Sequence, residues 1–360
     1  MNIFEATKSY ETWLSAQTCL IKPDLQLKHE GMRHDPFVFL RATYYRWAQV
    51  WPKVCKGLAA DATVMGVGDL HVENFGTWRD VDGRLVWGIN DFDECHPMPF
   101  TNDLVRLATS AYLAVGTNAM AIKPKSASTA ILEGYRAGLA CGGRPFVLVD
   151  KSTPLRVMAR ERLDAPEKFW EKLRSHPPVK GSVPAKAARA IRELLPDKSV
   201  SLKFLHRIAG MGSLGKQRFT GVGTWLGGLI AREAKALTPS AYCWAAGKKN
   251  KGVIHYDWLL RNAVRCPDPL VIVRGEWLIR RLSPDCFKIR LINLPERPDE
   301  KQLLYSMGWE TANVHLGSAK AANLSTHLKG KRSGWLHEAA KAMSLETFRD
   351  FKEWRKKSRT

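Results

Sequence analysis

The sequence predicts an α+β fold in which helices with acidic loops come first, a strand-rich block follows and helices return at the end. The composition, with 45% hydrophobic and 25% charged residues, is that of a folded globular protein. Short apolar runs that end in glycine or turn residues indicate strands in the middle of the chain. Apolar residues at helical spacing precede and follow that block. A length of 360 residues suggests two domains or one two-lobed unit.

The first part of the chain contains two predicted helices and two predicted strands. Aromatic and aliphatic side chains recur at helical spacing over Pro36–Val54. Ala62–Gly68 and Arg84–Ile89 are short apolar runs, which is typical of buried strands. Asp103–Ile122 is a longer apolar run and predicts a helix. Its uncharged part is shorter than the ~20 residues that a membrane helix needs, so we expect it inside a globular lobe.

The middle block predicts strands that form a sheet. Two strands flank the glycine-rich segment Gly210–Gly215, and Leu229–Ala234 is a candidate third strand. Pro269–Leu282 consists of two alternating runs around a turn, which indicates a hairpin, and Phe287–Leu294 is a further candidate strand. A helix is expected at His255–Val264.

The last part of the chain returns to helix over 302–316, 335–343 and 345–357. The final 36 residues hold ten basic and four acidic residues with aromatic residues between them. This pattern predicts a docking helix with a solvated basic face. The alternative is an arm that binds an anionic partner.

The charge of the chain is unevenly distributed. Lys and Arg number 56 and Asp and Glu 35, so the formal net charge is +21, and a strongly basic chain often binds an anion. The segment from Asp61 to Asp103, however, contains nine acidic residues and only two basic residues, both arginines. This segment is either an acidic surface loop or a cation site within a protein that otherwise attracts anions. A protein that binds a metal–nucleotide complex would show the second pattern.

Cysteine usage and the N-terminus bear on the compartment. The seven cysteines include no C-x-x-C pair, which favours reduced thiols. The first residues lack the basic and apolar regions of a signal peptide. We therefore expect a cytoplasmic protein without a membrane span.

The first motif, Gly68–Gly76, directly follows a predicted strand. Asp69 and Asn74 are five residues apart in the loop. At that spacing the carboxylate accepts a hydroxyl proton and the amide oxygen binds a divalent metal in phosphotransfer enzymes. His71 either contacts phosphate or substrate or forms a local hydrogen bond. The alternative is a simple turn, because Gly, Asp and Asn all favour turns.

The second motif, Asn90-Asp91-Phe92-Asp93-Glu94, follows the second predicted strand. Three carboxylates within four residues repel one another unless a cation lies among them. Mg²⁺ prefers one or two carboxylates together with phosphate oxygens and water. The motif therefore predicts a magnesium site, with a solvated acidic turn as the alternative.

The third motif is Gly210-Met211-Gly212-Ser213-Leu214-Gly215-Lys216, between two predicted strands. Glycines let the backbone approach phosphate closely. The segment opens no helix and lacks the G-K-[ST] ending of a Walker loop, which argues against a dinucleotide-binding or P-loop fold. A glycine loop between two strands is how a kinase covers the phosphates of ATP.

Together the three motifs resemble the protein-kinase-like superfamily, and within it the aminoglycoside and choline phosphotransferases. The chain is also similar, over about residues 30–345, to one bacterial domain-of-unknown-function family, number 2252. The sequence patterns that carry this similarity are G-D-L-H-x-E-N-F-G, I-N-D-F-D-E, R-I-x-G-x-G-S-x-G and M-G-W-E-T-A-N-V-H. This resemblance implies an ATP- and Mg²⁺-dependent phosphotransferase that transfers the γ-phosphoryl group to an unidentified hydroxyl acceptor.

The order of the motifs departs from that of an ordinary kinase. Val67 stands where the aminoglycoside and choline phosphotransferases have histidine. The glycine loop follows the acidic loops by more than a hundred residues, whereas it precedes them in an ordinary kinase. We therefore expect a circularly permuted two-lobed kinase-like fold, which requires only that the original termini lie close together. The expected parts are a helical catalytic lobe over 1–195, a β-rich nucleotide-binding lobe over 196–298 and C-terminal helices over 299–360 that pack on the catalytic lobe.

The resemblance also implies a role for each residue of the acidic loops. Asp69 would be the catalytic base, with His71 as a further catalytic candidate. Asn74 and Asp91 would hold the metal, and Asp93 would contact a second metal or the substrate.

Residues of the middle block would bind the nucleotide. The cation for the α- and β-phosphates is expected on the strand after the glycine loop, at Arg232, with Lys235 close by. An arginine there is atypical and leaves open a catalytically inactive nucleotide-binding protein. Asp257 and Glu233 are candidate partners for this cation, and Asp103 would brace the catalytic loop. The residues expected to contact phosphates are Gly210, Gly212, Ser213 and Gly215.

Other classes of function remain as alternatives. A nucleotidyl transferase uses the same fold. A metallophosphoesterase would need further Gly-Asp and Gly-Asn-His clusters, and these do not recur. A non-catalytic nucleic-acid-binding or regulatory module would use the basic surface.

Overall fold

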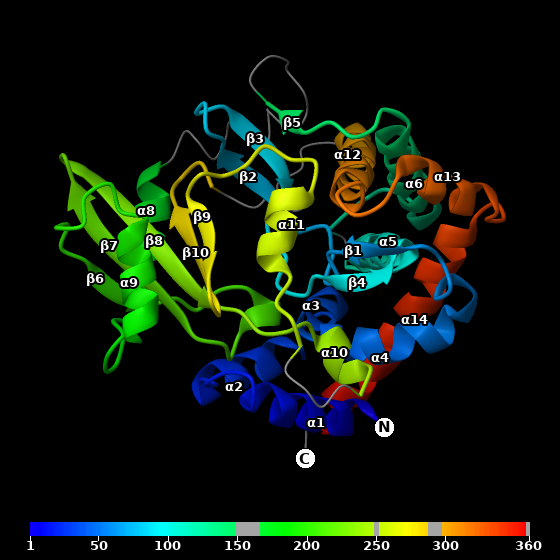
Figure 1. Ribbon diagram of the computed structural model, residues 1–360. Coiled ribbons are helices and arrows are strands. Elements are labelled where there is room, and N and C mark those ends of the chain that lie inside the picture. Colours follow the sequence, from blue (N-terminus) through cyan, green and yellow to red (C-terminus); the bar gives the residue numbers. More distant parts are fainter. Residues whose placement is uncertain (118, 149–165, 248–251, 287–296, 358–360) are drawn as a thin grey trace.

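The computed structural model describes residues 1–117, 119–148, 166–247, 252–286 and 297–357. It has a mixed α+β architecture with antiparallel sheets, as expected from the sequence. One sheet has five strands. It lies on one side of the molecule, and a group of helices lies on the other (Figure 1). We call these two parts the sheet half and the helical half.

The helical half combines segments from both ends of the chain. Helices α6 and α12 approach closely, because Gly134 and Gly308 have no side chain: a Cβ at Gly308 would lie 2.0 Å from the Ile131 carbonyl oxygen. Aliphatic and aromatic side chains of α1, α4, α5, α6, α12, α13 and α14 form one large core. The helices of this half are α1 (Ile3–Ser15), α2 (Lys22–Gly31), α3 (Pro36–Ala42), α4 (Tyr44–Val54), α5 (Phe100–Gly116), α6 (Pro124–Ala140), α12 (Arg297–His315), α13 (Ala321–Lys329) and α14 (Trp335–Lys357).

Some helix boundaries differ from the predicted ones. The predicted helix Pro36–Val54 is two helices, because Thr43 leaves the helical region with φ −122° and ψ 40°. The predicted helices 335–343 and 345–357 are instead one helix, α14. The apolar helix α5 begins at Phe100 and ends at Gly116, before the predicted end at Ile122.

Two small sheets carry the acidic loops. The predicted strands are confirmed as β1 (Thr63–Gly66) and β3 (Leu85–Ile89). Strand β1 pairs with β4 (His96–Pro99), and β3 pairs with β2 (Phe75–Arg79) and β5 (Phe146–Val147), all antiparallel. The loop between β1 and β2 holds Asp69, and the loop between β3 and β4 holds Asp91.

The sheet half is a five-stranded antiparallel sheet with the order β6-β7-β8-β10-β9. The predicted third strand and the predicted hairpin are confirmed, and the hairpin turn contains Gly275 with φ +59°. The candidate strand Phe287–Leu294 lies outside the described residues. The strands are β6 (Lys203–His206), β7 (Arg218–Trp225), β8 (Gly228–Ala236), β9 (Val271–Arg274) and β10 (Trp277–Leu282).

The two faces of this sheet differ in chemistry. Helix α9 (Ala185–Glu193) packs its small apolar side chains on one face, against Ala234 and Ala236 of β8. On the other face, α8 (Pro166–Arg174) covers Ala231 with Leu173. Because side chains alternate along a strand, Glu233 and Lys235 lie on this second face, which is turned toward the acidic loops. Helices α10 (Ala241–Ala245) and α11 (Tyr256–Asn262) follow the sheet strand β8.

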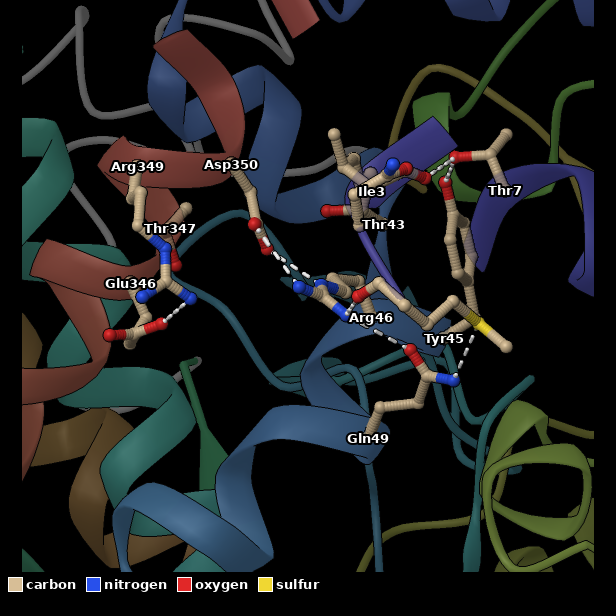
Figure 2. Close-up of polar contacts among 12 residues, drawn as sticks. Ile3, Thr7, Thr43, Tyr45, Arg46, Gln49, Glu346, Thr347, Arg349 and Asp350 are labelled. Carbon is tan, nitrogen blue, oxygen red and sulfur yellow. Dashed lines mark hydrogen bonds and ion pairs between the residues drawn. The ribbon is translucent and has the colours of Figure 1, made fainter. Parts of the chain in front are cut away.

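The first and last helices pack against each other. The rings of Phe4 on α1 and Trp354 on α14 stack with centroids 4.9 Å apart. Arg46 Nε on α4 donates to Asp350 Oδ2 on α14 at 2.7 Å, and Figure 2 shows this ion pair beside the contacts of α1. The basic C-terminal segment therefore docks as a helix, as predicted.

None of the described helices is both long and apolar enough to cross a membrane. All seven cysteines carry free thiols.

Candidate functional site

The predicted motifs meet in one pocket. This pocket, which we call the loop pocket, lies between the two acidic loops and the glycine loop Gly210–Gly215. Most of the predicted site residues line it, although the glycine loop follows the acidic loops by more than a hundred residues in the sequence. The predicted residues in its walls are Asp69, His71, Asn74, Asp91, Asp93, Gly210, Gly212 and Ser213.

Hydrogen bonds to Asp103 hold the loop that carries Asp69. The Asp103 carboxylate accepts hydrogen bonds from the backbone N–H groups of Val67 at 2.6 Å and Gly68 at 2.9 Å. His315 Nε2 lies 3.0 Å from the same carboxylate. Gly68 has φ +82°, and a Cβ there would lie 2.3 Å from the Glu94 carbonyl oxygen. These contacts provide the bracing predicted for Asp103 and require glycine at position 68.

Asp69 is held by a buried arginine. Arg106 Nη2 on α5 lies 2.5 Å from Asp69 Oδ1 and also donates to the Leu40 carbonyl oxygen at 2.7 Å. The guanidinium of Arg106 lies over the rings of Tyr44 and Trp47, at 5.3 and 4.7 Å from their centroids. Burial raises the pKa of Asp69, and Arg106 offsets part of that effect. The arrangement keeps the Asp69 carboxylate oriented within a largely dry environment.

Asn74 and His71 come from the same loop. The Asn74 side-chain nitrogen donates to the Asp69 carbonyl oxygen at 2.6 Å. Its side-chain oxygen has no hydrogen-bond partner among the residues that the structure describes. His71 is buried, and its Nδ1 accepts a hydrogen bond from the backbone N–H of Glu73 at 3.1 Å. The local hydrogen bond anticipated for His71 is therefore present.

A lysine of the sheet half reaches the second acidic loop. Lys235 Nζ on β8 lies 3.2 Å from Asp91 Oδ1 and forms an ion pair with Asp93. The Lys235 side chain is only 1% exposed. The other oxygen of Asp93, Oδ1, is buried and has no hydrogen-bond partner among the described residues. Lys235 is thus the cation that connects the sheet half to the acidic loops.

The structure corrects the prediction for Arg232. This residue is three positions before Lys235 on β8, so the pleat turns the two side chains to opposite faces of the sheet. The Arg232 guanidinium points toward the end of α9, where its Nε donates to the Leu194 carbonyl oxygen at 2.8 Å. Arg232 therefore does not reach the loop pocket.

The glycine loop lies close to Asp69. Gly210 and Gly215 have φ of +77° and +96°, conformations that favour glycine. A Cβ at Gly212 would lie 3.3 Å from Asp69 Oδ2, which shows how closely the loop approaches the acid. The Ser213 hydroxyl accepts a hydrogen bond from Arg218 at 2.6 Å. Gly215 instead packs on α2, where a Cβ would meet Leu25 at 2.4 Å, and it does not line the pocket.

A second acid of the sheet, Glu233, is surrounded by arginines. Its fully buried carboxylate lies 2.6 Å from Arg207 Nη1, 2.7 Å from Arg280 Nη2 and 3.5 Å from Arg218 Nη1. Although burial alone would oppose ionisation, the three guanidinium groups hold the pKa of Glu233 well below its usual value. We call these four residues the arginine cluster. Glu233 therefore does not pair with Lys235, and neither does Asp257, which forms an ion pair with Arg261 at 2.8 Å.

A larger cavity adjoins the loop pocket. This sheet cavity has a volume of about 420 Å³ and shares Arg41, Asp91 and Gly210 with the loop pocket. One wall is formed by the three arginines of the arginine cluster. Aromatic side chains also line the cavity, among them Trp78, Phe92 and Tyr256. An excess of positive charge beside apolar rings suits a ligand that carries both phosphate and an aromatic base.

Sequence reasoning missed two features of the site. Arg106 is one of two charges within a buried apolar helix, three residues after Asp103 and hence on the same helix face. This pair of charges was the available signal. The arginine cluster draws its members from β7, β8, β10 and the residue after β6, so no local sequence pattern indicates it.

No group of three His, Cys, Asp or Glu side chains converges as a ready-made metal site in the part of the chain that the structure describes. A metal here would need Asn74 and ligands from a bound nucleotide in addition to the carboxylates.

Comparison with known proteins gives one match. Residues 20–144 match the model of a family described as an uncharacterized protein conserved in bacteria (DUF2252). The matched segment runs from α2 to α6 and contains both acidic loops. No curated protein and no solved structure matches the chain significantly. The similarity is thus to the bacterial family that the sequence motifs resemble, over the segment that carries Asp69, Asn74 and Asp91.

Proposed function

We propose that this protein is an ATP- and Mg²⁺-dependent phosphotransferase with a kinase-like, circularly permuted fold. One observation carries the proposal: Asp69, Asn74 and Asp91 line the same pocket as the glycine loop, although the loop follows them from a separate half of the chain. In kinases, an aspartate and an asparagine five residues apart, a metal-binding aspartate and a glycine loop surround the transferred phosphoryl group.

The sheet half supports the kinase-like assignment. The glycine loop joins β6 to β7, and Lys235 lies on β8, the third strand. Kinases likewise carry the lysine of the phosphate site on the third strand. With Lys235 in this place, the atypical arginine that suggested an inactive protein is no longer an objection. The packing of α1 on α14 supports the permutation, which requires chain ends that lie near each other.

The oxygen atoms of the acidic loops fit a divalent cation. The Asn74 side-chain oxygen and Asp93 Oδ1 both lack a hydrogen-bond partner among the described residues, and Asp93 Oδ1 is buried. Asn74 and Asp91 would hold the metal, with Asp93 as an additional ligand. A bound Mg²⁺ would neutralise charge on the phosphate oxygens.

The residues of the chain have separate tasks in this proposal. The sheet cavity would take the nucleotide, with the arginine cluster near its phosphates. Asp69 would accept the proton of the acceptor hydroxyl, and Arg106 would keep the Asp69 carboxylate pointed at it. Positioning and charge neutralisation supply most of the rate in such transfers.

Thermal stability with nucleotide tests the proposal. Tm would be measured with ATP or ADP, with and without Mg²⁺, for the native chain and for Asp91→Ala. We expect Mg-ATP to raise Tm of the native chain and to have a much smaller effect on the variant. Asp257→Ala, which removes an exposed carboxylate, serves as the matched control and should respond like the native chain. Absence of any Mg-nucleotide effect on the native chain contradicts the proposal.

The products separate phosphoryl from nucleotidyl transfer. With ATP labelled in the γ-phosphate, a phosphotransferase passes the label to the acceptor and releases ADP, whereas a nucleotidyl transferase releases labelled pyrophosphate. Asp69→Ala should still bind Mg-ATP but lose transfer. A variant that keeps full transfer would exclude Asp69 as the base.

A further inference from the structure

The loop pocket extends beyond Asp69 to a set of polar side chains that the nucleotide does not account for. These side chains come from α1, α2, α4, the end of the second acidic loop and the residue after the glycine loop. The loop pocket as a whole is small, with a volume of about 40 Å³. The residues on this side of the pocket are Tyr10, Lys28, Tyr44, Tyr45, Glu94 and Lys216.

Two lysines are buried here without a carboxylate partner. Lys28 is 5% exposed and Lys216 is 4% exposed. Within the described parts of the chain, neither ammonium group lies within 4.0 Å of a carboxylate. The one side-chain hydrogen bond of Lys28 goes to the Gly212 carbonyl oxygen, at 3.4 Å. Burying an ammonium group without an opposite charge is costly, and burial lowers the pKa of Lys28 to about 8.

A buried hydroxyl points to the same place. Tyr44 is 4% exposed and lines the pocket, and its hydroxyl has no hydrogen-bond partner among the described residues. Leaving a buried hydroxyl unpaired is costly. One hydroxyl thus lacks an acceptor, and the two ammonium groups beside it lack a carboxylate within 4.0 Å in the described parts of the chain.

The nearby acid balances the charge of at most one lysine. Glu94 Oε2 accepts a hydrogen bond from the backbone N–H of Ala241 at 2.6 Å, and its carboxylate interacts electrostatically with Lys216. Asp69 is paired with Arg106, and Asp91 and Asp93 share Lys235. The pocket thus has spare positive charge on the side that faces Asp69 and the glycine loop.

We propose that this part of the loop pocket is the acceptor subsite, and that it binds a small hydroxylated acceptor through an anionic group held by Lys28, Lys216 and the Tyr44 hydroxyl. This inference rests on the proposed phosphotransferase function. The small volume favours a small acceptor. The anionic group is a carboxylate or a phosphate, and the hydroxyl lies toward Asp69.

The transfer is chemically complete with this acceptor. The acceptor oxygen forms a bond to the γ-phosphorus of ATP while the bond from that phosphorus to the β–γ bridging oxygen breaks. ADP leaves with the bridging oxygen, and the hydroxyl proton passes to the Asp69 carboxylate. The product carries a phosphate ester in addition to its original anionic group.

Four small probes separate the possible chemistries. Glycerate carries hydroxyls and a carboxylate, and glycerol 3-phosphate carries hydroxyls and a phosphate. Glycerol has no charge, and ethanolamine carries a cation. Dissociation constants would be measured by calorimetry on the full chain, and Mg-ATP would be titrated separately. We expect glycerate or glycerol 3-phosphate to bind at least tenfold more tightly than glycerol and ethanolamine.

Three variants assign that binding to the subsite. Lys28→Met and Lys216→Met should each weaken the anionic probe at least tenfold and leave the Kd of Mg-ATP within threefold of the native value. Tyr44→Phe removes the hydroxyl without changing the charge and should weaken the probe several-fold. Lys125→Met on the exposed surface of α6 is the matched control and should bind like the native chain. Because the lysines are uncompensated without ligand, their methionine variants should have Tm values equal to or above that of the native chain.

The outcomes distinguish the two proposals. If Mg-ATP binds but neither anion does, or if ethanolamine binds best, the subsite is wrong while the phosphotransferase proposal stands. If the lysine variants weaken Mg-ATP as much as the probe, the lysines belong to the triphosphate and the subsite is wrong. If the anion binds in a lysine-dependent manner but Mg-ATP does not bind, the phosphotransferase proposal fails, and with it the assignment of this anion site to an acceptor.

Discussion

Because three arginines surround Glu233, we expect a change of a single carboxylate oxygen to lower the stability of the fold strongly. In Glu233→Gln the shape is kept, but the charge is lost and one carboxylate oxygen becomes an NH₂ group. Arg207 donates to one oxygen at 2.6 Å and Arg280 to the other at 2.8 Å. In either orientation, the new NH₂ group therefore faces a donor.

The cost follows from burial. Glu233 is fully buried, and Arg218 beside it is only 6% exposed, so water does not replace the lost interaction. Removing one partner of a buried ion pair typically costs about 3–5 kcal/mol. We expect a loss of that size in the free energy of unfolding at pH 7, measured by urea denaturation. The carboxylate of Glu193, which pairs with Arg274 at the surface, is the matched control, and Glu193→Gln should cost less than about 1 kcal/mol.

The pH dependence provides a second readout for Glu233. Its folded pKa lies below the unfolded value, so its stabilisation is present above the unfolded pKa and is lost as pH falls through the folded pKa. The difference between the native chain and Glu233→Gln should therefore be largest near pH 7 and should narrow as the solution is acidified below the unfolded pKa. A loss below about 1 kcal/mol at pH 7, or a difference that widens in acid, would refute the reasoning.

Three further predictions concern the frame around the site. Asp103→Ala leaves two backbone N–H groups and His315 without their acceptor, and should cost about 3 kcal/mol or more in urea unfolding; a loss under 1 kcal/mol would show that the brace is dispensable. Burial raises the pKa of Glu310 to about 7, so its folded form holds a proton that the unfolded chain has released between pH 4.5 and 7, and stability falls over that range. Both Glu310 oxygens accept hydrogen bonds, from the Ile89 N–H and from Asn313 Nδ2, so Glu310→Gln loses one acceptor at every pH. Relative to the native chain, the variant should nevertheless gain up to about 3 kcal/mol in stability between pH 4.5 and pH 8, and equal effects at both pH values would contradict this. Gly68→Ala should lower Tm and any transfer activity together, whereas Gly57→Ala, where a Cβ meets nothing within 4 Å, should leave both unchanged.

The sequence was a good guide where the site depends on short segments. Asp69, Asn74 and Asp91 follow apolar strands directly, and each lines the pocket for which it was selected. The brace from Asp103 was expected from the resemblance to the kinase-like motifs, and the hydrogen bonds of its carboxylate to Val67 and Gly68 are consistent with it. These positions could be predicted because the residues next to them in the sequence indicate a strand or a helix.

The sequence did not predict which side chains face the site where this depends on the alternation of side chains along a strand or on contacts with residues remote in sequence. Arg232 and Lys235 are three residues apart, and only the pleat of β8 decides which of them reaches the acidic loops. Lys28 and Lys216 carry no local signal, because each is an ordinary lysine until α2 and the glycine loop are packed together. Tertiary contacts between elements remote in sequence determine these positions.

The discontinuity of the helical half has a consequence for biosynthesis. Helix α6 ends at Ala140 and its partner α12 begins at Arg297, so the ribosome adds about 150 residues between them. At 5–20 residues per second this interval is roughly 8–30 s. During that time the glycine face of α6, which later meets α12, is open on the nascent chain. Helix α14 also packs against α1 and α3 in the core, so this part of the core forms only after α14 has been synthesised.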